Sequence, residues 1–401
     1  MDSIMKYISN GNNIFVYGAA GTGKSYNIIQ IKKTNPYFEL CSSTGISALN
    51  IGGITFHNLF GVGIADKRPE EYLKYMKTEK KKFLRKLRGV IIDECSMLGA
   101  DAFEIADKVL RSLRGINKPF GGVQILLFGD FFQLPPIRAK YLFESDTWYD
   151  LDLKMVELKE VKRQADKDFI MLLSKLRLGN VDQEAREELK KMIRTPSDDM
   201  LLLCPLKEEA DRHNKKKLRE INEEEMIYNA TFGHEINSKN EPEEKHILNM
   251  YDFIRKNTTA REELILKKSC KVLYIKNDRE NGLVNGSEGI VIGFNGKLPI
   301  VKFGNRNITI SPLKFETKDT DDNIFYMSQI PLIVCYALSI HKSQGMTLSN
   351  AAINLGSNIF ERHQAYVAIS RIKSPDGVYI MQLDNSSFYT DPKVKTFYKN
   401  I

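Results

Sequence analysis

The segment GAAGTGKS, residues 18–25, limits the possible folds of this chain more than any other feature of its sequence. It follows the apolar stretch NIFVYG and precedes a helical pattern, the setting expected of a phosphate-binding loop (P-loop), G-x-x-x-x-G-K-[ST]. In such a loop, backbone N–H groups converge on phosphates, a lysine neutralises the terminal phosphates and a hydroxyl binds Mg²⁺. The sequence therefore predicts an α/β domain that binds a nucleoside triphosphate. The residues expected at the nucleotide are Gly18, Gly21, Thr22, Gly23, Lys24 and Ser25.

Two further apolar strands end in polar residues. VIIDECSML delivers Asp93 and Glu94, and LLFGDFFQLPP leads to Gln133. Because parallel strands end along one edge of a sheet, we expect these side chains to face the P-loop. Asp93 would hold Mg²⁺, Glu94 would orient or deprotonate the attacking water, and Gln133 would contact the γ-phosphate. Alone, the acidic pair would be a solvated strand end and Gln133 a turn residue. We expect Phe131 and Phe132 to be core residues rather than base-stacking ones.

The chain has 401 residues, a length typical of two to three domains. The pattern of apolar and polar residues changes along it. Residues 1–150 alternate short apolar runs with helical patterns, as in a parallel-sheet domain, and a Lys-rich stretch at about 62–88 interrupts them. Residues 151–230 and 329–401 predict a second domain of the same class. Between them, residues 231–328 contain charged linkers, short alternating strands and repeated Asn-Gly turns, which predict an inserted domain with a small antiparallel β-barrel.

Composition restricts the kinds of partner and compartment. Lys and Arg number 59 against 51 Asp and Glu, and the excess of +8 is concentrated in residues 77–88 and 212–219. Such runs permit a nucleic-acid partner, although each alone is as often a solvated helix face. The five cysteines are scattered, so neither a disulfide framework nor a zinc site is expected. The absence of a long apolar run and of a signal-peptide pattern predicts a soluble, cytoplasmic or nuclear protein that is not secreted and has no membrane partner.

Several ordered segments between residues 11 and 385 resemble those of one helicase family. They include GAAGTGKS, SSTGISALNIGGITFHNLFGVG, IIDECSML, NKPFGGVQILLFGDFFQLPP, LKEVKRQADKDFIMLLSKLRLGN, ALSIHKSQGMTLSNAAINLG and AYVAISRIKS. In these segments the chain resembles helicases of the petite-integration-frequency (Pif-one) family of superfamily one. The resemblance implies two RecA-like domains with parallel sheets, with ATP and Mg²⁺ in the cleft between them. It also implies that residues 62–88 form a basic helical wedge and that the inserted barrel is Src-homology-three-like.

The resemblance assigns roles to particular residues. Arg163 and Arg371 would be arginine fingers supplied by the second domain, and such groups are worth about 10³ to 10⁵ in rate. The expected catalytic residues are Lys24, Glu94, Gln133, Arg163 and Arg371, and Gly345 would join the nucleotide site. The expected metal ligands are Ser25 and Asp93. The expected nucleic-acid contacts are Thr44, Thr55, His57, His341, Lys342 and Gln344.

The function implied is an ATP-dependent DNA helicase that moves 5′ to 3′ on single-stranded DNA. It would bind single-stranded DNA and tailed or forked duplex DNA, and it would act as a monomer. Its cellular roles would be DNA replication, recombination and repair. The alternatives are an NTP-driven translocase or RNA-acting remodeller, and a non-catalytic scaffold with a vestigial P-loop. The chain departs from the family pattern at four points: no glutamine precedes the P-loop to select adenine, Ser43 replaces a common proline, Ser339 replaces a common threonine, and His363 replaces a usual glycine.

Overall fold

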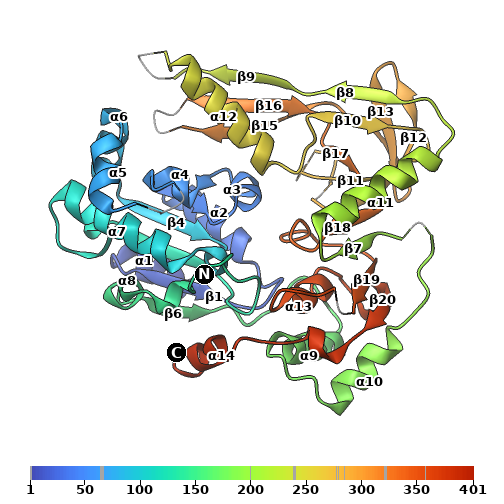
Figure 1. Ribbon diagram of the computed structural model, residues 1–401, viewed down its shortest axis with the longest axis horizontal. Coiled ribbons are helices and arrows are strands. Elements are labelled where there is room, and N and C mark those ends of the chain that lie inside the picture. The colour runs from blue at the N-terminus through green and yellow to red at the C-terminus, as the bar shows by residue number, and fades with distance from the viewer. Residues whose placement is uncertain are drawn as a thin grey trace.

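The computed structural model describes residues 2–63, 67–198, 200–237, 241–276, 278, 280–283, 285–319, 323–356 and 358–401. Two parallel sheets and a group of antiparallel sheets form three regions (Figure 1). No helix in these ranges is long and apolar enough to cross a bilayer.

The first domain is built on a six-stranded parallel sheet with the strand order β3-β2-β4-β5-β1-β6. The apolar runs form its centre because strands covered by helices on both faces must bury every side chain, as β4 does. The strands are β1 (Ile14–Tyr17), β2 (Phe38–Ser42), β3 (Ile54–Thr55), β4 (Gly89–Asp93), β5 (Gln124–Gly129) and β6 (Lys154–Glu157). The helices are α1 (Asp2–Ser9), α2 (Lys24–Thr34), α3 (Gly45–Asn50), α4 (Phe56–Phe60), α5 (Pro69–Tyr75), α6 (Thr78–Lys86), α7 (Ala100–Arg114) and α8 (Asp146–Asp150), with short 3₁₀ turns at Cys95–Met97, Pro119–Gly122 and Leu142–Glu144.

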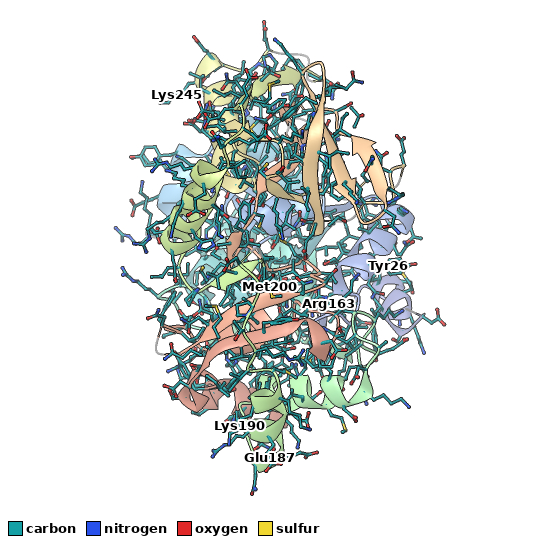
Figure 2. The ribbon with its side chains drawn as sticks, turned by 90° about the vertical axis from the view of Figure 1, so that its right-hand side faces the viewer. Tyr26, Arg163, Glu187, Lys190, Met200 and Lys245 are labelled. Carbon is teal, nitrogen blue, oxygen red and sulfur yellow. The ribbon has the colours of Figure 1, made fainter. Side chains whose placement is uncertain are left out.

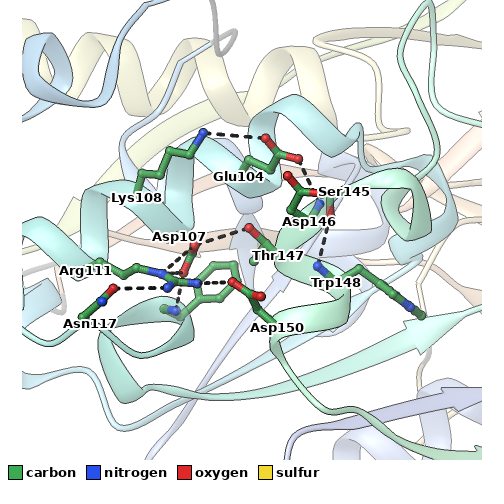
Figure 3. A network of polar contacts seen from close by, with 11 residues as sticks. Glu104, Asp107, Lys108, Arg111, Asn117, Ser145, Asp146, Thr147, Trp148 and Asp150 are labelled. Atoms are coloured by element: carbon green, nitrogen blue, oxygen red, sulfur yellow. Dashed lines mark hydrogen bonds and ion pairs between the residues drawn. The ribbon is translucent and has the colours of Figure 1, made fainter.

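A buried carboxylate organises the turn before β5. Asp107 on α7 is 3% exposed and accepts hydrogen bonds from Arg111 Nε at 2.8 and 2.9 Å, from the Phe120 N–H at 2.5 Å and from Thr147 Oγ1 at 3.3 Å (Figure 3). Phe120 has a φ of +50°, an unusual conformation for a bulky residue. The Asp107 network therefore fixes the PFGG turn and, through it, the entry into β5.

The second domain has a four-stranded parallel sheet with the order β18-β7-β19-β20. Its strands are β7 (Leu202–Cys204), β18 (Ala337–Ser339), β19 (Ala351–Leu355) and β20 (Val378–Leu383). Its helices are α9 (Lys167–Arg177), α10 (Gln183–Lys191), α11 (Lys207–Glu220) and α13 (Gln364–Ile369), with 3₁₀ turns at Pro375–Gly377 and Asn385–Ser387. The α/β class expected for both blocks is thus confirmed.

Antiparallel strands and one helix make up the inserted region. A five-stranded sheet has the order β14-β13-β12-β11-β17, a three-stranded sheet the order β15-β16-β9, and β10 pairs with β8. The elements are β8 (Met226–Asn229), β9 (Thr231–Glu235), α12 (Glu244–Asn257), β10 (Glu263–Leu266), β11 (Lys271–Tyr274), β12 (Ser287–Asn295), β13 (Leu298–Phe303), β14 (Arg306–Thr309), β15 (Leu313–Lys318), β16 (Ile324–Gln329) and β17 (Leu332–Val334). Residues 277, 279 and 284 of the expected barrel lie outside the described residues.

Four elements lie elsewhere than the expected boundaries put them. β6 pairs with β1, so the first sheet extends past residue 150. β8 and β17 join antiparallel sheets, so the inserted region is wider than residues 231–328. The last helix, α14 (Pro392–Lys399), returns to the first domain, where Phe397 packs 5.6 Å from Trp148 between ring centroids. The C-terminus accordingly lies near β6 in Figure 1. Each difference reflects long-range packing that local periodicity does not encode.

The Lys-rich segment forms two helices, α5 and α6, that pack against the first domain. Leu84 is fully buried, and Tyr72, Met76 and Phe83 pack on the same core. The lysines of α6 stay at the surface, so the segment is amphipathic rather than a fully solvated arm. Residues 64–66, which the prediction included, lie outside the described residues.

Candidate nucleotide site and nucleic-acid surface

The expected strand ends meet at one edge of the first sheet. β5 lies between β1 and β4, with Tyr17 opposite Gly129 and Ile92 opposite Leu127. The P-loop after β1, the acidic pair after β4 and the segment after β5 are therefore neighbours. This is the edge at which parallel α/β sheets bind ligands.

Close packing explains the glycines of the P-loop. Gly21 has a φ of +82°, and a Cβ on it would lie 2.6 Å from the Cβ of Arg163. Lys24 opens α2, is 9% exposed, and its Nζ donates to the carbonyl oxygens of Gly18 at 2.7 Å and Ala19 at 3.1 Å. Burial lowers the pKa of Lys24, and nearby carboxylates oppose the shift. A buried ammonium beside the loop is well placed to meet phosphate oxygens.

The other P-loop residues have separate structural roles. Thr22 is 3% exposed and its Oγ1 donates to the carbonyl oxygen of Ala19 at 2.9 Å, so it shapes the loop. Gly23 precedes α2 with a φ of +87°, which favours glycine. Ser25 is exposed on the first turn of α2, at the positive end of the helix.

The acidic pair lies at the carboxyl end of β4, with Asp93 buried and Glu94 half-buried. Asp93 is 4% exposed, and its Oδ1 accepts from the Glu94 N–H at 2.9 Å. Burial and the charge of Glu94 raise the pKa of Asp93 to about 7, and burial also raises the pKa of Glu94. Glu94 has a φ of +48°, a strained conformation of the kind found at functional sites. Two neighbouring carboxylates, one buried and one half-buried, are costly unless a cation offsets them, so the pair fits a divalent metal ion.

Arg163 and Arg371 lie together at the seam between the domains. Arg163 donates from Nη1 to the Ser370 carbonyl at 2.9 Å, and Arg371 donates from Nη2 to the Ser370 hydroxyl at 2.9 Å. Burial lowers the pKa of both, and the charge of Arg371 helps to bring that of Arg163 to about 9. Neither forms an ion pair within the described part of the chain. Two neighbouring guanidinium groups without carboxylate partners fit an anion such as a phosphate.

The origin of Arg163 differs from the expectation. It was expected to come from the second domain, but the N–H of Lys162, the residue before it, donates to the Gly21 carbonyl at 2.8 Å. Arg163 therefore belongs to the strap between β6 and α9, with its backbone on the P-loop and its side chain on the second domain. Figure 2 shows it beside the second-domain strands. Arg371 follows α13, as expected.

Two glutamines lie buried near the acidic pair. Gln133 is 2% exposed, and its N–H donates to the Asp130 carbonyl at 2.8 Å. Gln344 is 8% exposed, and Gly345 follows it with a φ of +79°. Glu94 Oε2 and Gln344 Nε2 are buried with no hydrogen-bond partner among the described residues, although Gln344 is close enough to lower the pKa of Glu94. These two orphaned polar atoms mark a place where a water or a phosphate oxygen would fit.

The expected nucleic-acid residues of the first domain have structural partners. Thr44 Oγ1 accepts from the Ser47 N–H at 3.2 Å on α3, and Thr55 Oγ1 caps α4 by accepting from the Asn58 N–H at 3.3 Å. His57 is half-buried on α4, and burial lowers its pKa. Their contact with nucleic acid stays a prediction.

Two of the nucleic-acid residues expected in the second domain, His341 and Lys342, lie beside aromatic or charged side chains. The His341 ring is nearly parallel to that of Phe360, with centroids 6.4 Å apart, and Phe360 is 53% exposed. Lys342 borders a cavity of about 300 Å³ that Lys207 and Arg261 also line. Burial, with the nearby positive charges, lowers the pKa of Lys342 to about 8. Four cations and two carboxylates line this cavity, so its local charge is positive. Cationic grooves and exposed aromatic rings are the features that bind single strands.

Four residues at the domain seam were not singled out from the sequence. Asp130 after β5 is fully buried and forms a bidentate ion pair with Arg177 of α9, at 2.7 and 2.9 Å. Burial would raise the pKa of Asp130, but the charge of Arg177 outweighs it and the pKa is lowered. Tyr366 and Gln164 also cross the seam. Nothing in their local sequence separates them from ordinary structural residues; the only signal was the position of Asp130 at a strand end.

His363 forms part of the same seam and gives a testable pH dependence. It is 3% exposed, has a φ of +64°, and neither ring nitrogen has a hydrogen-bond partner within the described ranges. Burial lowers its pKa to about 4; Asp130 opposes the shift, and Arg362, Arg177 and Lys395 add to it. The folded protein favours the neutral ring. The contribution of His363 to the free energy of unfolding is therefore fully present above its unfolded pKa of about 6.5 and is lost as the pH falls towards 4.

We therefore expect the wild-type free energy of unfolding to fall by about 3 kcal/mol more than that of a His363→Asn variant between pH 7 and pH 4. Asparagine tolerates the left-handed backbone and does not titrate. Denaturant titrations across this pH range measure the difference. Equal pH slopes in the two proteins would show that His363 is not the responsible group.

The P-loop lies on one parallel sheet, and Arg371 faces it from the domain of the second parallel sheet. This arrangement defines a two-domain P-loop NTPase. Comparisons with known proteins then specify the family. A family model described as PIF1-like helicase matches residues 1–187. The chain is 34% identical to "ATP-dependent DNA helicase Pif1" of Bdellovibrio bacteriovorus, covering 99% of this chain and 90% of that protein. It is 32% identical to the human "ATP-dependent DNA helicase PIF1", spanning 63% of that relative's length. The chain belongs to the PIF1-like family of ATP-dependent DNA helicases.

Solved structures agree with this placement. A Bacteroides Pif1 in complex with ADP-AlF₄ has a TM-score of 0.85 at 26% identity, covering 100% of this chain and 95% of that one. The Candida albicans Pif1 structure has a TM-score of 0.76 at 33% identity, covering 100% and 98%. A Bacteroides Pif1 bound to single-stranded DNA has a TM-score of 0.68 at 26% identity, covering 100% and 95%.

Proposed function

We propose that this chain moves 5′ to 3′ along single-stranded DNA as a monomer and unwinds tailed or forked duplexes. The observation that supports this most is a pair of guanidinium groups at the domain seam, beside a P-loop with a buried lysine. Neither guanidinium has an ion-pair partner in the part of the chain that the structure describes. If Lys24 of the first domain and Arg371 of the second domain bind the same phosphate group, nucleotide binding depends on the relative position of the two domains. Hydrolysis would then drive domain motion.

In the proposed reaction, Lys24 and the P-loop amides hold the phosphates of ATP. Glu94 orients and deprotonates the attacking water, and its raised pKa suits a group that must accept a proton. Gln133 and Gln344 would orient the same water and the γ-phosphate. Arg163 and Arg371 would stabilise the charge that develops in the transition state.

A magnesium ion is part of this proposal. Among the described residues there is no cluster of three His, Cys, Asp or Glu side chains that could hold a metal ion. Mg²⁺ commonly takes only one or two protein oxygens and completes its shell with water and phosphate. Asp93 and Ser25 would supply the protein oxygens. The bound ion would neutralise phosphate charge and relieve the acidic pair.

The DNA track would cross the tops of both parallel sheets. Thr44, Thr55 and His57 would contact the strand on the first domain, and His341 and Lys342 on the second. Gln344, which the sequence also assigned to the strand, lies beside Glu94 and is proposed to act at the nucleotide instead. The cationic cavity at Lys342 and the exposed ring of Phe360 support the second half of this path. The amphipathic helices α5 and α6 would act as the wedge, and the five-stranded antiparallel sheet as an Src-homology-three-like module.

Steady-state ATP hydrolysis with no nucleic acid, with single-stranded DNA or with single-stranded RNA tests the proposal. We expect hydrolysis that requires Mg²⁺ and rises at least about tenfold with DNA. Stimulation by RNA alone would favour an RNA-acting remodeller instead. No hydrolysis under any condition would favour a DNA-binding scaffold.

A further inference from the structure

The second domain contacts the P-loop at a backbone amide. Tyr366, in the middle of α13, accepts a hydrogen bond at its Oη from the Ala20 N–H at 3.1 Å. Tyr366 is 3% exposed and Ala20 is 7% exposed, so water does not compete freely for either group. A hydroxyl of the second domain thus accepts the hydrogen bond of one P-loop amide. Neighbouring amides of the same loop bind phosphate in P-loop proteins.

Tyr366 is also tied to the arginine turn that follows α13. The Ser370 N–H donates to the Tyr366 carbonyl at 2.9 Å, which places the Ser370–Arg371 pair one helical turn further on. Gln164 on the strap donates from Nε2 to the carbonyls of Ser370 at 3.1 Å and Ile372 at 2.8 Å. A movement of α13 relative to the P-loop would therefore displace the Tyr366 hydroxyl and Arg371 together.

The chemistry of the phenol suits a second role when nucleotide is bound. A tyrosine hydroxyl accepts with its lone pairs and donates one proton. Burial raises the pKa of Tyr366, so it keeps that proton at neutral pH. It lies near the positive charges of Arg163, Arg177 and Arg371, which also attract phosphate.

We propose that Tyr366 is a γ-phosphate-sensing residue: its hydroxyl holds the Ala20 amide in the nucleotide-free protein and donates to the terminal phosphate of bound ATP. This contact lets α13, and with it Arg371, respond to the presence of a third phosphate. The inference rests on the proposed nucleotide site. It adds to that site a neutral group that distinguishes a triphosphate from a diphosphate.

The test is the affinity of a Tyr366→Phe variant for two magnesium nucleotides, ADP and the non-hydrolysable β,γ-imido analogue of ATP. Phenylalanine keeps the ring and removes only the oxygen. A hydrogen bond to a charged group is worth about tenfold or more in affinity, so we expect the analogue to bind about tenfold more weakly while ADP binding changes less than about twofold. The ratio of the two affinities is unaffected by any change in the folded fraction.

Tyr336→Phe is the matched control, since its buried hydroxyl accepts from the Lys271 N–H at 3.1 Å in the inserted region, away from the P-loop. It should leave the affinity ratio unchanged. If Tyr366→Phe also leaves the ratio unchanged while the wild type binds both nucleotides, the sensing role is wrong and the nucleotide site stands. If the wild type binds neither nucleotide, the proposed function itself fails.

Discussion

Replacing Glu94 by glutamine should slow ATP turnover by about 10² to 10⁴-fold, the usual effect of removing a general base. Glutamine has nearly the same shape but cannot accept the proton of the attacking water. Binding of ATP and of single-stranded DNA should change little, because neither requires that proton transfer. Unwinding should therefore be lost while both ligands still bind.

The stability of this variant separates a catalytic role from a structural one. Burial raises the pKa of Glu94, so a neutral isostere should leave the melting temperature unchanged or raise it. Glu223→Gln, at an exposed position after α11, is the control and should retain wild-type turnover. A Glu94→Gln variant that unwinds at the wild-type rate would remove Glu94 from the proposed reaction.

The second large effect is expected at Arg371. Changing it to lysine keeps the positive charge but loses the planar fork that can donate twice to phosphate. We expect turnover to fall by about 10³-fold, within the range of arginine-finger losses, with a much smaller change in the affinity for ADP. Pre-steady-state hydrolysis measured beside nucleotide binding distinguishes these effects.

Arg186→Lys on α10 provides the comparison, because this exposed arginine donates to the Val181 carbonyl at 3.1 Å and lies outside the seam. It should hydrolyse ATP at the wild-type rate. Turnover within about twofold of wild type in Arg371→Lys would contradict the assignment of a finger to this position.

Local sequence was sufficient to predict the first sheet edge. The P-loop, Asp93 and Gln133 each follow an apolar run within a few residues, and a parallel sheet brings such strand ends together by its topology. The resemblance to a helicase family was needed for Arg163 and Arg371, since an isolated arginine has no local pattern that marks it as a finger. Phe131 and Phe132, expected in the core, are 0% and 2% exposed.

Contacts between distant segments could not be predicted in this way. The Asp130–Arg177 pair, the Tyr366 contact with Ala20 and the packing of Phe397 on Trp148 each join residues far apart in the chain. Such pairs depend on how two domains and a terminal helix dock, and no periodicity records that. The same limit explains why β6 was expected in the second domain: a strand of four residues does not reveal which sheet it joins.

The most direct test of the account is ATP-driven unwinding of two DNA duplexes that differ only in carrying a 5′ or a 3′ single-stranded tail. We expect rapid strand separation of the 5′-tailed duplex with ATP and Mg²⁺, little with the 3′-tailed duplex, and none when Glu94 is changed to Gln. Preferential unwinding of the 3′-tailed duplex would contradict the proposed direction, and equal unwinding by Glu94→Gln would contradict the coupling of strand movement to hydrolysis at this site.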